Sequence, residues 1–358
     1  MIIPFFIPHA GCPHQCVFCD QKRITGKKSA VHPASVPATI RSFLAAKASD
    51  GHQEAGIQAA ERPRDVQVAF YGGSFTALPP ELQQAYLREV RPFLDAGEVR
   101  SIRISTRPDR ITPGVLALLR KHQVATVELG VQSLDNDVLH HSGRGHTSEH
   151  TVAATRLLRE QGFLIGYQLM PGLPKDSRTR FRETVIRTVE LGPDMVRIYP
   201  VLVIRDTPLE KLFHDGVYAP LAREDAVAWC AEAQEQFEAA GIDVIRIGLQ
   251  HTETLARPGT VVAGPYHPAF GQLVASSRFL KLMTSVLADI TPGSDAVLRV
   301  HPADLSTALG QKKRNIPILL GRTKARKIVV RTDAAVPRGT VTLDMTLDHT
   351  CINPLFGI

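Results

Sequence analysis

Three cysteines lie within a short stretch near the start of the sequence. The segment "GCPHQCVFCD" (11–20) places Cys12, Cys16 and Cys19 in the spacing CxxxCxxC. The chain has 358 residues and only five cysteines, whereas disulfide frameworks belong to small, cysteine-rich secreted chains. Clustered cysteines in a reducing compartment usually bind metal or take part in catalysis. The spacing therefore predicts a metal-binding or catalytic loop.

The residues before this loop do not resemble a secretory signal. The leader "MIIPFFIPHA" has no basic region, and Pro4 and Pro8 break its short apolar run. No run of 18 apolar residues occurs in the sequence, so no membrane span is expected. We expect a cytoplasmic protein whose thiols stay reduced.

Two kinds of metal site are compatible with three cysteines. A structural zinc ion needs four side-chain ligands, which His9 or His14 could complete, because Cys230 and Cys351 are far away in sequence. An iron–sulfur cluster held by three thiolates instead leaves one iron without a protein ligand. An open metal position of that kind indicates catalysis.

The CxxxCxxC spacing with Phe18 before its last cysteine resembles the signature of the radical S-adenosylmethionine (SAM) enzymes. The resemblance implies that Cys12, Cys16 and Cys19 hold a [4Fe–4S] cluster whose open iron chelates SAM. One electron, from a donor such as flavodoxin or ferredoxin, would then cleave SAM to methionine and a 5′-deoxyadenosyl radical. That radical would abstract a hydrogen atom from the substrate.

Apolar, β-branched runs alternate with helical patterns along the next part of the chain. Strands are predicted at 66–73, 99–106, 124–133, 162–170 and 195–200, and helices at 79–94, 112–122, about 147–161 and up to residue 191. This alternation predicts an α/β fold with a parallel sheet. About six units fit before residue 205, too few for an eight-fold barrel, and the resemblance implies a partial (β/α)6 barrel. Residues 47–64 are expected to form an inserted loop.

Several motifs follow the predicted strands, where parallel folds place their chemistry. In "YGGSF", Gly72 and Gly73 allow the backbone to approach a ligand closely, although a plain turn explains them too. The other motifs are "ISTRPD", "VELGVQS", "SGRGHT", "YQLMPGLP" and "IYPVLVIRDTPLEKL". Together they resemble the radical SAM domain of the Elongator catalytic subunit family over roughly residues 1–250. The oxygen-independent coproporphyrinogen oxidases share a looser version.

The resemblance implies a set of SAM-contacting residues: Phe18, Gly72, Gly73, Ser74, Ser105, Gln132, Arg144 and Gln168. Ser105 occupies the position of a ribose contact, and Gln132 and Arg144 occupy positions that reach the methionine part. The guanidinium of Arg144 is suited to a bidentate grip on a carboxylate. Gln132 and Gln168 can also be explained as satisfied polar groups inside the barrel.

Other polar residues have two explanations each. Arg107 and Arg197 either face the substrate or form structural ion pairs. His140, His141 and His146 cluster in sequence without a zinc-protease motif, so we expect a loop over the active site.

The C-terminal part is basic. The chain has a net charge of +7 and a pI near 9.3, and residues 311–331 contain no Asp or Glu. The predicted order of strand 296–302, helix 303–309, turn 310–313, helix 314–320 and strands 326–331 and 339–345 resembles a KH RNA-binding core. Its loop residues Lys312, Lys313 and Arg314 would meet nucleic-acid backbone, although Lys313 replaces a glycine of the family's clamp. A solvated charged face is the alternative.

The sequence thus predicts a radical SAM partial-barrel domain at 1–250 and a basic, KH-like α+β domain at 251–358. We expect a radical SAM enzyme that modifies RNA, specifically tRNA. A radical SAM enzyme acting on a small anionic molecule such as a tetrapyrrole is one alternative, and a non-catalytic iron–sulfur RNA-binding protein is another. The Elongator acetyltransferase domain does not fit after residue 250, so its acetyl-transfer chemistry is not expected.

Overall fold

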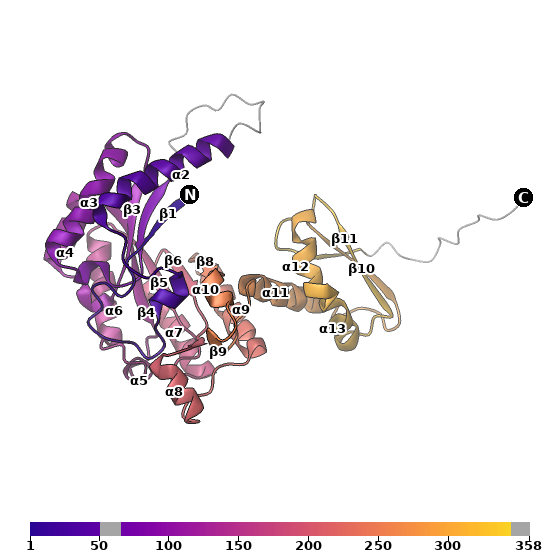
Figure 1. The fold of residues 1–358 in the computed structure, drawn as a ribbon. Helices are drawn as coiled ribbons and strands as arrows, with labels where there is room; N and C mark the ends of the chain where they lie inside the picture. The colour runs from indigo at the N-terminus through magenta and orange to yellow at the C-terminus, as the bar shows by residue number, and fades with distance from the viewer. Residues whose placement is uncertain (51–65, 345–358) are drawn as a thin grey trace, which may run out of the picture. The chain divides into compact units, whose positions relative to one another are not determined.

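The computed structural model describes residues 1–50 and 66–344 (Figure 1). The chain divides into two compact units, Met1–Pro268 and Ala269–Ile358. The predicted boundary at residue 250 falls inside the first unit. The reason is a long-range pairing, since β9 (Val261–Ala263) lies antiparallel to β7 (Val203–Ile204).

The first unit is built on a parallel sheet of seven strands in the order β1-β2-β3-β4-β5-β6-β8. These strands are β1 (Ile2–Phe6), β2 (Gln67–Tyr71), β3 (Ser101–Thr106), β4 (Val124–Gln132), β5 (Leu164–Leu169), β6 (Met195–Ile198) and β8 (Asp243–Ile247). The predicted α/β partial barrel is confirmed. The sheet extends beyond the last unit predicted before residue 205, because β8 pairs with β6.

Helices connect the strands. They are α1 (Gln21–Thr25), α2 (Val36–Asp50), α3 (Pro80–Asp95), α4 (Pro113–Lys121), α5 (Asn136–His141), α6 (Ser148–Glu160), α7 (Arg178–Leu191), α8 (Pro208–His214), α9 (Arg223–Ala239) and α10 (Glu253–Ala256). Their ends follow local chemistry: the Thr112 side chain accepts a hydrogen bond from Val115 N–H at the start of α4, and Gly192 ends α7 with φ 58°. Helix α2 continues to Asp50, where a loop had been predicted from residue 47; the rest of that loop lies outside the described residues.

The two faces of the sheet differ in chemistry, because successive strand residues point to opposite faces. One face is apolar and buried, and Figure 1 shows α3, α4 and α6 along one side of the sheet. The buried residues of this face include Ile3, Phe5, Val68, Phe70, Ile102, Ile104, Val127, Leu129, Ile165, Tyr167, Val196 and Ile198. The opposite face, here called the inner face, carries Tyr71, Arg103, Ser105, Glu128, Gln168 and Arg197. A polar inner face cannot be an ordinary hydrophobic core, so it suits a binding site.

The second unit is a small α+β structure. It contains α11 (Phe270–Val286), β10 (Asp295–Val300), α12 (Leu305–Leu309), α13 (Asn315–Arg322), β11 (Lys327–Thr332) and β12 (Thr342–Asp344). Strand β10 is central, parallel to β11 and antiparallel to β12. The core is formed by side chains that include Phe279, Met283, Leu287, Leu298, Val300 and Leu319. The predicted order of strand, helix, loop, helix and strand is therefore found, preceded by α11, which was not predicted.

Among residues 1–50 and 66–344, no helix has the length and apolar character needed to cross a membrane.

Candidate functional site

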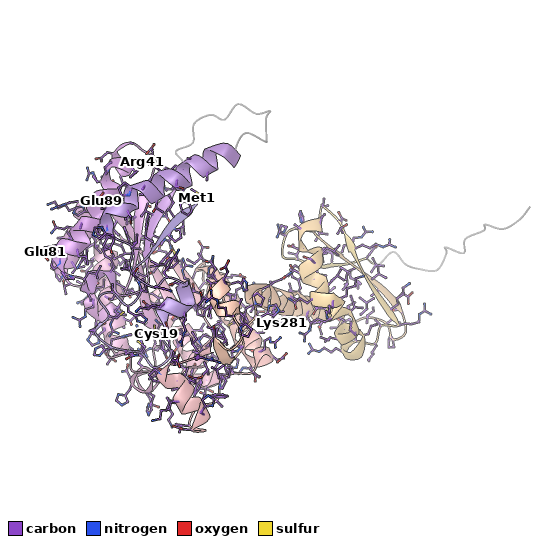
Figure 2. All side chains as sticks on the ribbon, viewed as in Figure 1. Met1, Cys19, Arg41, Glu81, Glu89 and Lys281 are labelled. Carbon is purple, nitrogen blue, oxygen red and sulfur yellow. The ribbon has the colours of Figure 1, made fainter. Side chains whose placement is uncertain are left out.

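The three clustered cysteines lie on a loop between β1 and α1, here called the cysteine loop (residues 9–20). Cys12 N–H donates to the His9 carbonyl at 3.2 Å, and Cys19 N–H donates to the Cys16 carbonyl at 3.1 Å. Val17 anchors the loop on two sides: its N–H donates to the Ser142 carbonyl at 3.1 Å, and its carbonyl accepts from Leu209 N–H at 2.8 Å. Figure 2 marks Cys19, which stands just before α1. The loop is thus held by segments far apart in the sequence.

A reciprocal pair, His9 and Gln21, closes the base of the cysteine loop. Gln21 N–H donates to His9 Nε2 at 3.0 Å, while Gln21 Oε1 accepts hydrogen bonds from His9 N–H and from Gly73 N–H, the latter at 2.7 Å. This pair was not found from the sequence, since neither residue belongs to a recognisable motif. It connects the cysteine loop directly to the glycine pair after β2.

Gly72 and Gly73 have φ angles of 76° and 63°, which favour glycine. A Cβ placed on Gly73 would lie 2.2 Å from the Ala10 carbonyl oxygen and 2.7 Å from the Ile7 carbonyl oxygen. The sequence suggested that the glycine pair approaches a ligand. The structure shows that Gly73 also packs tightly against the cysteine loop, so a side chain there would disturb the loop itself.

Two predicted SAM contacts have structural neighbours. The buried Ser74 hydroxyl lies 3.0 Å from Thr106 Oγ1, and Ser74 N–H donates to the Ala10 carbonyl at 2.8 Å. Phe18 is buried in an apolar cluster with Leu173 and Val201. Both residues therefore hold the surroundings of the cysteine loop together, and a direct cofactor contact by either one stays a prediction.

The three thiols share one electrostatic environment. Burial, followed by the charges of Cys16 and Cys12, raises the pKa of Cys19 to about 12 against the lowering effect of Arg144. Burial, followed by the charge of Cys16, also raises the pKa of Cys12. The thiols are therefore close enough to interact, and binding them as thiolates requires a strong positive partner. A metal cluster supplies such a partner.

Arg144 links the cysteine loop to the strand ends. Its Nη1 lies 3.1 Å from Cys16 Sγ, and its Nη2 donates to the Gly130 carbonyl at 2.6 Å. Gln168 Nε2 donates to Gln132 Oε1 at 3.0 Å. A Cβ on Gly130 would lie 3.1 Å from Gln132 Nε2 and 3.2 Å from Arg144 Nη2, so Gly130 is the small residue around which these side chains gather.

Ser105 lies near the end of β3 on the inner face, where it pairs in register with Glu128. It is half-buried, so its hydroxyl is partly open to a ligand. Of the eight predicted SAM contacts, Gln132, Arg144 and Gln168 are therefore gathered round Gly130, and Ser105 stands on the same edge of the sheet.

The segment "SGRGHT" (142–147) contacts the cysteine loop, since the Ser142 carbonyl accepts from Val17 N–H and Gly145 packs against the His14 ring. Its position over the active site stays a prediction. The three histidines do not come together. His140 and His141 are exposed at the end of α5, whereas His146 is buried. Burial, with the charges of Arg144 and Arg107, lowers the pKa of His146 to about 3.

The zinc alternative finds little support in the histidines. His9 Nε2 already accepts the Gln21 N–H, and the His14 ring packs over Gly145, where a Cβ would meet it at 2.5 Å. Within the described part of the chain, no three His, Cys, Asp or Glu side chains surround one ion position, the three cysteines included, so this arrangement does not distinguish zinc from a cluster. Cys230 is buried in α9, where burial raises its pKa, and Cys351 lies outside the described residues.

Arg107 and Arg197, which the sequence assigned either to the substrate or to structural ion pairs, both form ion pairs. Arg107 binds Asp109 through two hydrogen bonds of 2.8 and 3.2 Å. Arg197 Nε donates to Glu128 Oε2 at 2.7 Å. Glu128 belongs to the motif "VELGVQS", but the sequence assigned it no role, because its arginine partners are distant in the chain.

In the second unit, the basic loop (residues 310–314) connects α12 and α13. Lys312, Lys313 and Arg314 are exposed there. Lys312 and Lys313 have φ angles of 51° and 58°, a left-handed conformation that is unfavourable for lysine. Gly310 packs closely at the base, since a Cβ there would lie 2.7 Å from Ser276 Oγ.

Family models match most of the first unit. The Radical SAM superfamily model matches residues 6–187, and the Radical_SAM C-terminal domain model matches residues 193–279. The chain belongs to the radical SAM superfamily. As a member of this superfamily of enzymes, it has a [4Fe–4S] cluster and SAM as its cofactors, and the coupled thiols beside Arg144 fit that donor set.

The relatives of this radical SAM protein include tRNA-modifying enzymes. It is 30% identical over 246 residues to a tRNA uridine(34) acetyltransferase from Methanocaldococcus infernus, covering 61% of this chain and 46% of the relative. It is also 30% identical over 241 residues to the oxygen-independent coproporphyrinogen-III oxidase-like protein HemZ from Bacillus subtilis, covering 64% of this chain and 46% of the relative. The chain thus spans about half the length of these relatives.

A solved structure shows the same fold. The archaeal Elp3 from Methanocaldococcus infernus, with an N-terminal deletion, matches with a TM-score of 0.59 and 22% identity, over 78% of this chain and 62% of that chain. The resemblance of the linked motifs to the Elongator catalytic subunit family is matched by relatives that carry that name, and the archaeal Elp3 structure shares the fold.

Proposed function

We propose that this radical SAM enzyme holds its [4Fe–4S] cluster on Cys12, Cys16 and Cys19, cleaves SAM reductively, and modifies tRNA. The observation that carries the proposal is the contact between Arg144 and Cys16, which joins the cysteine loop to the strand ends at Gly130. When bound, the cluster supplies the electron that cleaves SAM to methionine and a 5′-deoxyadenosyl radical.

The residues round Gly130 bind and orient SAM in this proposal. The Gly130 carbonyl fixes one edge of the Arg144 guanidinium, leaving further donors for the SAM carboxylate. Gln168 orients the Gln132 amide through the 3.0 Å hydrogen bond, and Gln132 meets the methionine part. Ser105 donates to a ribose hydroxyl, and the backbone at Gly72 meets the amino group.

The tRNA substrate is supported by two features. The tRNA uridine(34) acetyltransferase relative names the substrate class for that protein. In addition, the basic loop presents Lys312, Lys313 and Arg314 to solvent on a strained backbone, and backbone strain is concentrated at ligand clamps. The basic loop binds RNA phosphates, and a flavodoxin or ferredoxin supplies the electron.

The test is anaerobic turnover of the reconstituted enzyme with SAM, a chemical reductant and bulk tRNA lacking modification. The tRNA is then digested, and its nucleosides are compared by mass spectrometry with those of a reaction without SAM. A new nucleoside mass that depends on SAM supports the proposal. SAM cleavage accompanied by unchanged nucleosides would reject tRNA as the substrate while leaving the radical SAM activity in place.

A further inference from the structure

The inner face of the sheet carries an ion cluster that the SAM site does not use. Glu128 on β4 lies between two arginines: Arg103 Nη1 donates to Glu128 Oε1 at 2.6 Å, and Arg197 Nε donates to Glu128 Oε2 at 2.7 Å. Tyr71 and Gln67 complete it, since the Tyr71 hydroxyl accepts from Arg197 Nη2 at 3.0 Å and Gln67 Oε1 accepts from Arg103 Nη2 at 3.0 Å. We call this group the inner-face ion cluster.

The cluster lies directly beside the SAM residues, since Glu128 is the register partner of Ser105 and Arg197 is the register partner of Gln168. Arg103 precedes Ser105 by two positions on β3, and Glu128 precedes Gly130 by two positions on β4. Residues two apart on a strand share a face, so Arg103 and Glu128 lie on the same face of the sheet as Ser105 and Gly130. A ligand bound there would be next to SAM without occupying the position assigned to the SAM carboxylate.

The cluster has more positive than negative charge. Burial alone would raise the pKa of Glu128, but the hydrogen bonds and charges of Arg197 and Arg103 outweigh burial and lower it, so Glu128 is ionised. This single carboxylate faces two guanidinium groups whose side chains are 8% and 12% exposed. Arg103 Nε is also buried without a hydrogen-bond acceptor among the described residues. Uncompensated positive charge away from water is costly.

A third arginine increases this excess. Arg246 on β8 is the register partner of Arg197. Its side chain is half-buried, and it has neither a hydrogen bond nor an ion pair with any residue in the described part of the chain. Arg246 also lies close enough to Tyr199, the residue after β6, for its charge to oppose the effect of burial on the Tyr199 pKa. Two guanidinium groups thus pair with Glu128, and Arg246 adds a third cation on the neighbouring strand.

We propose that the inner face binds a terminal oxyanion, a carboxylate or a phosphate, of a small molecule that the enzyme uses together with SAM. Arg246 and Arg197 contact the oxyanion, and Glu128 is a positioning residue that fixes Arg197 and Arg103. A planar guanidinium pairs with either oxyanion through two hydrogen bonds. The side chains of Arg103, Glu128 and Arg197 are only 8%, 7% and 12% exposed, so a terminal group can reach them more readily than a phosphate inside a polymer backbone. The proposal does not depend on tRNA being the substrate.

The experiment is an anaerobic calorimetric titration of the SAM-saturated holoenzyme, first with inorganic phosphate and separately with acetate. Saturating SAM fills the carboxylate position at Arg144 before the probe is added. We expect at least one probe to bind at a single site per chain, and the preferred probe distinguishes a phosphate ligand from a carboxylate ligand. Arg246→Gln should weaken that binding at least tenfold, because it removes an unpaired cation. Arg182→Gln, an exposed arginine on α7, is the matched control and should bind as the parent does.

A second variant should change the oxyanion affinity in the opposite direction. Glu128→Gln removes the internal carboxylate that competes with the ligand, so it should tighten oxyanion binding. Because Glu128→Gln also leaves buried arginines without a counter-charge, it can fail to fold, and Arg246→Gln then decides alone. Equal dissociation constants for Arg246→Gln and the parent, or no saturable binding of either probe, would overturn the proposal. The proposal would also be overturned if neutralising the basic loop abolished probe binding while Arg246→Gln bound the probe as the parent does. That result would locate the oxyanion in the second unit.

Discussion

A methyl group at Gly73 should prevent the cluster from loading, because Gly73 packs against the cysteine loop. The added Cβ would lie 2.2 Å from the Ala10 carbonyl oxygen, a distance at which one backbone segment must move. Moving Ala10 breaks its 2.8 Å hydrogen bond from Ser74 N–H and shifts the loop that carries Cys12. If the role of Gly73 were limited to contacting SAM, the cluster would still load.

The loss of stability expected for Gly73→Ala has a backbone contribution and a steric contribution. Alanine at a left-handed φ costs about 1 kcal/mol, since glycine alone adopts this region freely. Overpacking adds about 1–3 kcal/mol, and the lost backbone hydrogen bond adds about 1 kcal/mol. We therefore expect Gly73→Ala to lower the free energy of unfolding by about 3–5 kcal/mol. If the cysteine loop moves to relieve the contact instead, the three cysteines lose the arrangement that holds the cluster.

Gly97→Ala is the matched control for the backbone contribution. Gly97 has a φ of 68°, and a Cβ there would meet no atom within 4 Å. Iron content after anaerobic reconstitution and chemical unfolding should be measured for both variants. We expect Gly97→Ala to load iron like the parent and to lose only about 1 kcal/mol of stability. If Gly73→Ala matches Gly97→Ala in both measurements, the packing argument is wrong.

Three further predictions concern the cofactors and RNA. Cys16→Ala should abolish iron binding, because three thiolates leave no spare ligand, whereas Cys230→Ala should retain the parent's iron content; iron retained in Cys16→Ala would refute the ligand assignment. Arg144→Met should weaken SAM binding about tenfold to a hundredfold, since a charge-assisted hydrogen bond is worth about 1.5–3 kcal/mol, and Arg144→Lys should recover only part of the lost affinity. Equilibrium dialysis of the iron-loaded protein measures the SAM affinity. An unchanged affinity in Arg144→Met would exclude the contact. Changing all three cations of the basic loop to Gln should lower tRNA affinity and flatten its dependence on salt in filter binding, whereas coincident curves at two salt concentrations would remove the RNA role of the loop.

The sequence predicted those parts of the fold that depend on local pattern. The predicted strands at 99–106 and 124–133 correspond to β3 and β4, because apolar, β-branched runs bounded by turn residues are a local signal. Helix α4 was predicted from Thr112 and Pro113, whose effects act within one turn. The cysteine spacing likewise pointed directly to the proposed cluster loop, because the three proposed ligands are neighbours in sequence.

Contacts between distant segments could not be predicted in the same way. Arg144 reaches Cys16 across 128 positions, and Arg197 reaches Glu128 across 69 positions. Both contacts depend on strand order and register, which set which side chains share the inner face. The second role of Gly73, as a packing residue under the cysteine loop, is also a property of the assembled backbone. Similarly, β9 belongs to the first unit only because it pairs with β7.

The most direct test of the radical SAM assignment is detection of 5′-deoxyadenosine. The reconstituted protein is incubated anaerobically with SAM and dithionite, and the products are separated by liquid chromatography and identified by mass spectrometry. We predict 5′-deoxyadenosine and methionine in equal amounts, formed by the parent and absent with Cys16→Ala. If the iron-loaded, reduced parent leaves SAM intact both with and without tRNA, the proposed use of the cysteine loop and Arg144 for SAM cleavage is contradicted.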